Sequence, residues 1–168
     1  MKGRYTRATR LGIIGLMAFL GACERVPEHS IIPVPQQVVM GRGTFTLDAK
    51  VGVQFMDSSD EGAVSVFDIW AAPFRESGVL SLSPSEDGIF RFGVDGQGEP
   101  ESYRLHVTRD GIDLSAADHA GLLYGLQTLS QLMPPDAETG GTPESLEVPV
   151  PEIEDTPRFS YRGVHLDV

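Results

Sequence analysis

The sequence is poor in the residues that build metal sites and disulfides. Its 168 residues include one cysteine and four histidines. The single cysteine, Cys23, excludes an intramolecular disulfide and any zinc site made of paired cysteines. The histidines are scattered, with no two at the spacing of metal ligands: His29, His106, His119 and His165. We therefore predict no metal site and no cofactor, and we interpret His119 as a surface or helix-capping residue.

Motifs of several common enzyme classes are also missing. The chain has no phosphate-binding loop that ends in Gly-Lys-Ser/Thr, no His-Glu-x-x-His zinc motif and no Gly-x-Ser-x-Gly nucleophile motif. Glycines at 93, 96 and 98 lack the spacing of a dinucleotide-binding loop, and no helix pattern follows them. This stretch is therefore predicted to be a turn.

Basic residues are scarce and unevenly placed. The chain has 13 Lys and Arg against 24 Asp and Glu, a net charge of −11. Four of the basic residues lie in the first ten positions: Lys2, Arg4, Arg7 and Arg10. Removal of residues 1–22 leaves 9 basic against 24 acidic residues, a net charge of −15. A chain this acidic is repelled by phosphate backbones, so nucleic acid is not expected as a partner.

The N-terminus has the parts of a secretory signal. Basic residues precede an uncharged run at 11–22, which is too short for a permanent membrane span because that takes about 20 residues. Residues 20–23 (LGAC) resemble a bacterial lipobox, whose cysteine receives a diacylglyceryl group and becomes the new N-terminus. The alternative is an ordinary signal peptide with an unrelated cysteine near its cleavage point.

We expect a lipoprotein signal peptide at 1–22, lipidation at Cys23 and a tether at 23–30. These features predict an exported protein held on the bacterial cell envelope, in the periplasm or at the outer membrane, with the membrane as a partner through Cys23.

Residues 31–153 contain mainly strand patterns. Two prolines at alternate positions favour an extended edge segment at 31–40, and the glycines at 41–43 predict a turn after it. Alternating apolar residues or short apolar runs predict strands at 44–47, 51–55, 79–82, 89–94, 101–108, 112–115 and 146–153. Asp110-Gly111 predicts a hairpin between the strands at 101–108 and 112–115.

A first helix is predicted after residue 58. Ser58 and Glu61 have the spacing of a capping box, and Gly78 ends the helix. Four apolar residues share one face: Ala63, Phe67, Trp70 and Phe74. Pro73 lacks an N–H, which predicts a kink or an early end.

A second helix is predicted over residues 117–133. Asp118 can accept N–H bonds at its start. The apolar stripe consists of Leu122, Leu126, Leu129 and Met133. Gly121 and Gly125 would allow another backbone to approach closely. With hairpin-connected strands, these elements predict an α+β two-layer sandwich, with a mostly antiparallel sheet and both helices on one face.

The last residues, 157–168 (PRFSYRGVHLDV), indicate a turn followed by a short buried strand. No strand follows to pair with it, so we expect it to open a second domain. Together with residues 120–132 (AGLLYGLQTLSQL), it closely resembles the family-20 glycoside hydrolases, the β-N-acetylhexosaminidases. The resemblance implies an N-terminal α+β domain at 31–153, followed at 154–168 by the first strand of a truncated (β/α)₈ barrel.

The resemblance also implies roles for individual residues. Arg162 matches the family arginine that hydrogen-bonds hydroxyls of the N-acetylhexosamine in the −1 subsite, a task that suits the fixed fork of a guanidinium. Without the motif, Arg162 would be interpreted as a surface residue that pairs with Asp155 or Glu154. Asp167 matches a family acidic position, which we interpret as structural support.

The family hydrolyses terminal non-reducing β-linked GlcNAc or GalNAc with retention. The substrate's own acetamido oxygen attacks C1, a Glu acts as acid and then base, and an adjacent Asp orients the acetamido group. That Asp-Glu pair lies on a later barrel strand, so these 168 residues contain no catalytic residue, and glycans would bind through the missing barrel. A stand-alone noncatalytic module that binds glycan or protein is the alternative.

Overall fold

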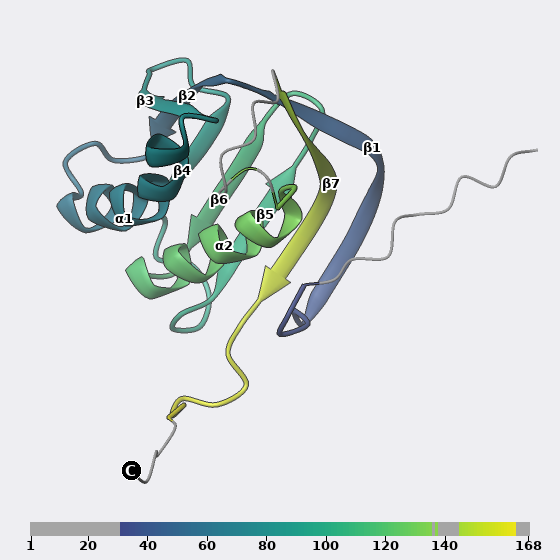
Figure 1. Ribbon diagram of the computed structural model, residues 1–168. Helices are drawn as coiled ribbons and strands as arrows, with labels where there is room; N and C mark the ends of the chain where they lie inside the picture. Colours follow the sequence, from purple (N-terminus) through teal and green to yellow (C-terminus); the bar gives the residue numbers. More distant parts are fainter. Residues whose placement is uncertain (1–30, 136, 138–144, 164–168) are drawn as a thin grey trace, which may run out of the picture.

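The computed structural model describes residues 31–135, 137 and 145–163. They form seven strands and two helices (Figure 1). In chain order these are β1 (Gln37–Asp48), β2 (Lys50–Phe55), α1 (Glu61–Ser77), β3 (Ser81–Pro84), β4 (Phe90–Val94), β5 (Tyr103–Val107), β6 (Ile112–Ala116), α2 (His119–Leu132) and β7 (Ser145–Asp155). The signal peptide, Cys23, the tether and Asp167 lie outside the described residues, so those predictions stay predictions.

The seven strands form one mixed sheet in the order β1-β7-β5-β6-β4-β2-β3. Three neighbouring pairs are parallel, namely β2–β3, β2–β4 and β4–β6, and three are antiparallel. The prediction of a mostly antiparallel sheet is therefore wrong. The β2–β3 pair is parallel because α1 carries the chain from β2 back to the edge where β3 starts, as a crossover helix does.

The α+β class is confirmed, and both helices lie on the same face of the sheet (Figure 1). The other face is polar. One row of cross-strand neighbours on it consists of Glu152, His106, Asp113 and Arg91, and Arg91 donates to Asp113 at 2.5 Å. The apolar core therefore lies between the helices and the sheet. Neither described helix has the length and hydropathy needed to span a membrane.

Helix α1 begins at Asp60 rather than at the predicted Ser58. The Asp60 carboxylate accepts the Ala63 N–H at 3.1 Å, and Gly78 ends the helix with a φ of 71° as predicted. The helix continues through Pro73 to Ser77. Both Pro73 and Ile69, whose carbonyl loses its N–H partner, lie on the exposed side, where water can replace the missing donor.

Helix α2 begins where predicted. Asp118 accepts the Gly121 N–H at 2.9 Å, and the predicted apolar stripe from Leu122 to Met133 is buried. A methyl group on Gly121 would lie 2.4 Å from the Ser102 carbonyl oxygen, so the predicted close backbone approach is confirmed there. A methyl group on Gly125 would instead meet a side chain, since it would lie 2.4 Å from Cδ1 of Leu114.

Two polar contacts and a set of aromatic rings tie the helices to each other and to the sheet. Trp70 Nε1 donates to Ser130 Oγ at 2.8 Å, which joins α1 to α2. The Tyr103 hydroxyl lies 2.7 Å from that of Thr128, and burial raises the pKa of Tyr103 to about 12. Phe55, Phe67, Trp70, Phe74, Phe90 and Phe92 pack edge-on or tilted in the core between α1 and the sheet.

Strands β1 and β7 are longer than predicted. The predicted turn at 41–43 is instead an irregularity within β1, where the register shifts between Met40 and Thr44. Pro149 and Pro151 lie inside β7 without ending it. Both prolines pair with the residues of β1 on either side of this irregularity. They lie outside residues 152–155, the part of β7 that pairs with β5. The missing proline N–H groups therefore fall where the pairing is already interrupted.

The chain leaves the sheet after Asp155. Residues 159–163, the described part of the predicted terminal strand, form no strand and are exposed. Because the expected partner strands belong to a barrel beyond residue 168, that prediction stays a prediction. Phe159 is 71% exposed and Tyr161 is 87% exposed. Within the described residues no neighbouring strand offers backbone groups for them to pair with.

Candidate functional site

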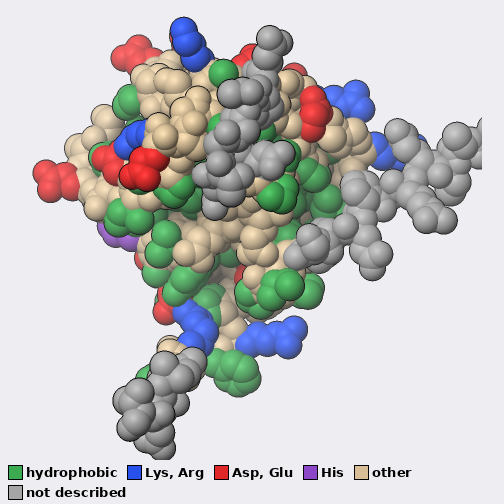
Figure 2. Space-filling view, viewed as in Figure 1, with side chains coloured by type: hydrophobic (Ala, Val, Ile, Leu, Met, Phe, Trp, Pro, Cys, Tyr) green, Lys and Arg blue, Asp and Glu red, His purple; other side chains and the backbone are tan. Residues whose placement is uncertain are grey.

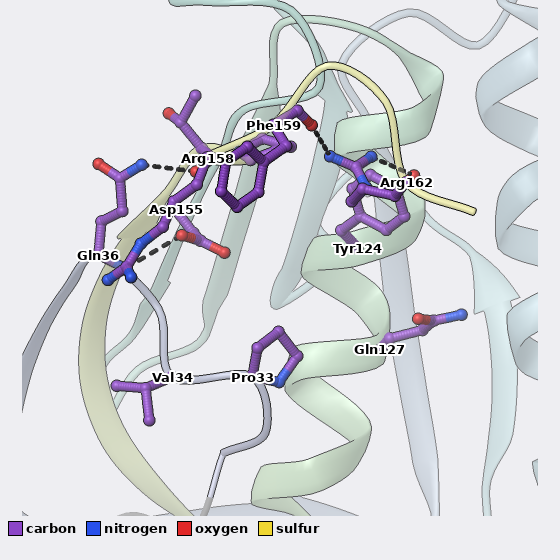
Figure 3. A pocket seen from close by; sticks show the side chains of 11 residues that line it. Pro33, Val34, Gln36, Tyr124, Gln127, Asp155, Arg158, Phe159 and Arg162 are labelled. Atoms are coloured by element: carbon purple, nitrogen blue, oxygen red, sulfur yellow. Dashed lines mark hydrogen bonds between the residues drawn. The ribbon is translucent and has the colours of Figure 1, made fainter. Parts of the chain in front are cut away.

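A groove of about 540 Å³ lies at the end of the molecule where β7 leaves the sheet. Three parts of the chain line it, namely residues 33–36 before β1, the side of α2, and residues 155–162, here called the exit segment. Figure 3 shows Pro33, Val34, Tyr124, Gln127, Phe159 and Arg162 among its lining residues. The groove is therefore built from segments that are distant in sequence.

Hydrogen bonds fix the walls of this groove to one another. The Gln36 N–H donates to Asp155 Oδ1 at 3.0 Å, and Gln36 Nε2 donates to the Thr156 carbonyl at 2.6 Å (Figure 3). On the α2 side, Gln131 accepts the Ile32 N–H at 2.8 Å and donates to the Ile32 carbonyl at 3.1 Å. The segment before β1 is thus held on α2 and on the exit segment at once.

Arg162 contacts both α2 and its own segment. Its Nη1 donates to the Phe159 carbonyl at 3.0 Å, and its Nη2 donates to the Tyr124 hydroxyl at 3.1 Å (Figure 3). The guanidinium carbon lies 5.4 Å from the centre of the Tyr124 ring, within the range of a cation–π contact. Nη2 also forms an ion pair with Glu101, which raises the pKa of Arg162 above its ordinary value.

Glu101 is held in an uncommon backbone conformation. Its φ is 65°, in the left-handed region that residues other than glycine rarely adopt. Its N–H donates to Asp118 Oδ2 at 2.8 Å, while Asp118 Oδ1 caps α2. The Gly121 N–H is the main cause that lowers the pKa of Asp118. A continuous set of contacts therefore joins the start of α2, Glu101 and Arg162.

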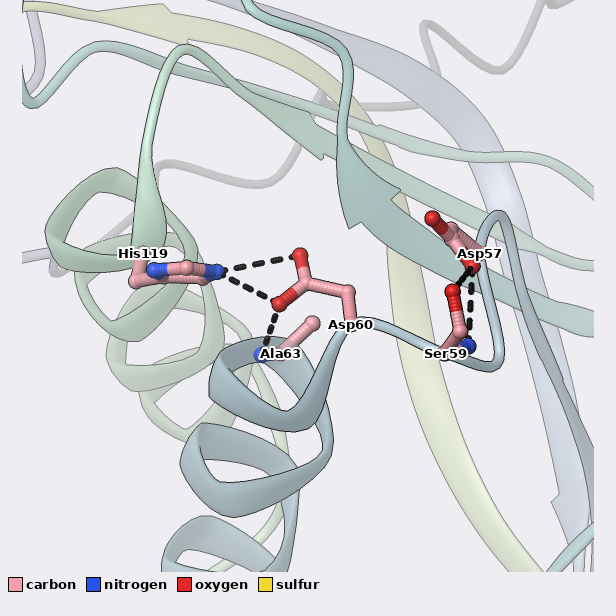
Figure 4. A network of polar contacts seen from close by, with 5 residues as sticks. All are labelled: Asp57, Ser59, Asp60, Ala63 and His119. Atoms are coloured by element: carbon pink, nitrogen blue, oxygen red, sulfur yellow. Dashed lines mark hydrogen bonds and ion pairs between the residues drawn. The ribbon is translucent and has the colours of Figure 1, made fainter.

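A second polar network joins the starts of the two helices. His119 Nε2 lies 2.8 and 3.0 Å from the two oxygens of Asp60, the residue that caps α1 (Figure 4). Nearby, Asp57 accepts the N–H and the hydroxyl of Ser59 at 2.8 and 2.6 Å. Within the described ranges, no group of three His, Cys, Asp or Glu side chains has metal-site geometry. The predicted surface or capping position of His119 is confirmed, since its side chain is half exposed beside a helix cap.

The structure brings Arg162 to a groove that sequence reasoning did not predict. The carboxylate that pairs with Arg162 is Glu101, neither Asp155 nor Glu154. Tyr124 lies in the helix motif at 120–132 that resembles the family, but nothing in the sequence indicated that it contacts Arg162. Of the predicted special residues, Cys23 and Asp167 lie outside the described residues.

The comparisons with known proteins concern the whole folded region. The sequence model described as glycosyl hydrolase family 20, domain 2, matches residues 28–156, which are most of the chain. The chain belongs to glycosyl hydrolase family 20.

Two curated relatives show how far the family likeness extends. A β-hexosaminidase from Porphyromonas gingivalis is 32% identical over 157 residues, which cover 86% of this chain and 20% of that protein. A β-hexosaminidase from Vibrio furnissii is 42% identical over 151 residues, covering 82% of this chain and 21% of the relative. This family-20 chain therefore spans about a fifth of the length of these relatives.

Solved structures of family-20 proteins have the same fold in this region. The β-N-acetylhexosaminidase from Streptomyces coelicolor superposes with a TM-score of 0.70 at 31% identity, over 79% of this chain and 27% of that chain. The exo-β-N-acetylglucosaminidase from Vibrio harveyi, in complex with N-acetylglucosamine, gives a TM-score of 0.68 at 25% identity, over 79% and 20%. The mixed sheet with two helices is thus shared with proteins several times longer.

Proposed function

We propose that this chain is the N-terminal part of an exported β-N-acetylhexosaminidase that hydrolyses terminal non-reducing β-linked GlcNAc or GalNAc. The observation that carries the proposal is the family match over residues 28–156, together with relatives named β-hexosaminidase at 32% and 42% identity. Because the chain spans about a fifth of those relatives, the catalytic part is assigned to sequence beyond residue 168.

In this proposal residues 154–168 open the catalytic (β/α)₈ barrel. The exposure of the exit segment supports it. Phe159 and Tyr161 expose most of their rings, and residues 159–163 leave their backbone groups without strand partners among the described residues. Large apolar side chains and unpaired backbone groups are stabilised when a neighbouring strand and domain cover them.

Arg162 is proposed to hold hydroxyls of the sugar in the −1 subsite. Its present contacts show which groups its guanidinium can bind in this environment, namely a carboxylate, a hydroxyl and a carbonyl. Sugar hydroxyls are acceptors of the same kind as the Tyr124 hydroxyl. The planar fork of Arg162 can hold two such oxygens in a fixed geometry, whereas the donors of a lysine ammonium rotate and impose no such geometry.

The proposed reaction proceeds with retention and substrate assistance. The acetamido oxygen of the substrate attacks C1, a Glu protonates the leaving oxygen and then activates water, and an adjacent Asp orients the acetamido group. These two acids are assigned to a later barrel strand. The 168 residues themselves therefore supply a scaffold and one substrate-binding residue, and no cofactor is required.

The test is hydrolysis of 4-nitrophenyl β-GlcNAc by the complete polypeptide that the gene encodes. We expect release of 4-nitrophenol from the β-anomer, none from the α-anomer, and none by chain 1–168 alone. Absence of activity on β-GlcNAc and β-GalNAc substrates, with the protein folded, would overturn the proposal and favour a noncatalytic binding module.

Arg162→Lys in the complete polypeptide should lower kcat/KM for the β-GlcNAc substrate about 10- to 100-fold, because hydrogen bonds to charged groups contribute about 1.5–3 kcal/mol. Arg158→Lys is the matched control. Arg158 lies on the same segment, is exposed and has no ion pair among the described residues, so its replacement should leave kcat/KM within twofold (about 0.4 kcal/mol). Equal kinetics of the two variants would contradict the role of Arg162.

A further inference from the structure

We infer that the folded domain itself rests on the bilayer surface, through Ile32 and Val34 of the entry segment, here defined as residues 31–36. This contact goes beyond the proposed hydrolysis and depends on lipidation at Cys23. Acyl chains alone would hold the protein on the membrane but leave it free to turn about its tether. A second, apolar contact would give it one orientation.

Ile32 and Val34 are exposed although the segment that carries them is fixed. Ile32 is 77% exposed and Val34 is 69% exposed, whereas Ile31 is buried. Gln131 binds both backbone groups of Ile32, and Gln36 is bonded to the start of the exit segment. In Figure 3 the Val34 side chain extends away from α2. Neither side chain can therefore turn into the core without breaking these bonds.

The entry segment is uncharged in a chain that is rich in acidic residues. Residues 31–41 contain no Asp, Glu, Lys or Arg, whereas the whole chain has a net charge of −11. Ile69 on the outer side of α1 is 67% exposed as well, but it lies beside Glu61 and Asp68, and Figure 2 shows acidic side chains over α1. Carboxylates oppose the approach to a membrane surface rich in anionic lipids. The entry segment brings no carboxylate of its own to that surface.

The length of the predicted tether limits which surface can reach the bilayer. Residues 23–30 join the predicted lipid to Ile31, and eight residues span at most about 28 Å when fully extended. A folded domain of about 130 residues has a radius of about 18 Å, so the path around it to the far side is about 55 Å. Helix α1 lies toward the sheet edge opposite β1 (Figure 1). The tether is therefore too short to let the outer side of α1 replace the entry segment at the bilayer.

A lipid surface is the partner that suits these side chains. Ile32 and Val34 carry no charged or hydrogen-bonding group, so they can contribute only the non-directional burial of apolar surface. Apolar side chains of proteins at membrane surfaces insert about 5–10 Å into the boundary between headgroups and acyl chains. The tether also keeps the bilayer at a high effective concentration, which a soluble partner lacks.

Photo-crosslinking in the complete polypeptide identifies what covers these side chains. The photoreactive residue p-benzoylphenylalanine replaces Ile32 in one variant and Val34 in a second. Ile69 is the matched control position, because it is an aliphatic residue of similar exposure on another surface. Exposed positions tolerate such replacements, so each variant should keep the thermal midpoint of wild type. Membranes of the bacterial host are irradiated, and the adducts are identified by mass spectrometry.

Phospholipid adducts should form at positions 32 and 34, with a yield about tenfold or more above that at position 69, because the tether holds the entry segment at the bilayer. Cys23→Ala combined with the probe at position 32 should lose the lipid adduct. Adducts to protein instead of lipid at position 32, or equal lipid adducts at positions 32 and 69, would overturn the contact. Hydrolysis is measured on the same samples, so a protein that forms lipid adducts without turnover contradicts the proposed function alone.

Discussion

The carboxylate of Asp60 contacts the first residues of both helices. It accepts the Ala63 N–H at the start of α1, and its two oxygens lie within hydrogen-bonding distance of His119 at the start of α2. The Ala63 N–H is the main cause that holds the pKa of Asp60 below its ordinary value, and His119 lowers it further. The stability that Asp60 contributes must therefore depend on pH.

Asp60→Asn separates the charge of this residue from its capping role, because asparagine caps helices about as well as aspartate. A carboxyl group whose folded pKa is depressed stabilises the fold above its unfolded pKa of about 3.9, and this stability is lost as the pH falls through the folded pKa. The unfolding free energy of Asp60→Asn should therefore decline less than that of wild type between about pH 5 and about pH 2.

Urea unfolding at several pH values measures this difference. Asp60→Ala removes the cap as well and should cost about 0.5–2 kcal/mol already at neutral pH. Parallel pH profiles for wild type and Asp60→Asn would show that the carboxylate charge contributes nothing.

The sequence predicted the capping residue of α2 but not that of α1. Asp118 was predicted because it directly precedes the apolar periodicity of α2. For α1, Ser58 had the better sequence pattern, but Asp60 forms the cap, while Asp57 and Ser59 form a turn just before it. The partner of Arg162 was beyond sequence reasoning. Glu101 is 61 positions away, and only the folded sheet brings them together.

Helix α2 is the element on which the groove and the core both depend. Its inner side is packed so closely on the loop before β5 that a methyl group on Gly121 would lie 2.4 Å from a backbone oxygen of Ser102. A backbone carbonyl cannot move aside as the end of a flexible side chain can. The helix must therefore shift if this glycine is replaced.

Gly121→Ala should lower the unfolding free energy by up to about 2 kcal/mol, since overpacking costs about 1–3 kcal/mol and the gain in helix propensity offsets about 1 kcal/mol of it. Ser65→Ala, at an exposed position of α1, is the control and should be neutral or slightly stabilising. Chemical denaturation of chain 1–168 measures both. A stabilised Gly121→Ala would mean that the backbone at Ser102 yields without cost.

At the scale of elements, the sequence predicted the order of strands and helices better than their connections. The Asp110-Gly111 hairpin was recognised because its turn chemistry is local, and β5 and β6 pair accordingly. The parallel pairs β2–β3 and β4–β6 were missed, because which strands become neighbours is decided by packing over long sequence separations. The prolines of β7 are tolerated for a similar reason, since the cost of a proline in a strand depends on what lies opposite it.

The whole molecule combines an acidic surface with a proposed attachment to membranes. The net charge is −11, and −15 once residues 1–22 are removed. Membrane surfaces rich in anionic lipids are negatively charged, so electrostatic attraction cannot hold this chain on a membrane. Neither of the described helices could anchor it by spanning the bilayer. A covalently attached lipid is the anchor that the sequence predicts.

Lipidation at Cys23 would supply that anchor. Each buried CH₂ contributes about 0.8 kcal/mol, so a diacylglyceryl group resists both high salt and dilution, whereas a peripheral electrostatic contact is released by salt. Expressed in a bacterial host, the wild-type protein should remain in the membrane pellet after a high-salt wash, and Cys23→Ala should move to the soluble fraction. Ser30→Ala, in the same predicted tether, is the control and should stay in the pellet. Mass spectrometry of the mature N-terminus should find acylated Cys23. Cys23→Ala retained in the washed pellet, or an unmodified mature N-terminus in wild type, would show that this cysteine is not the anchor.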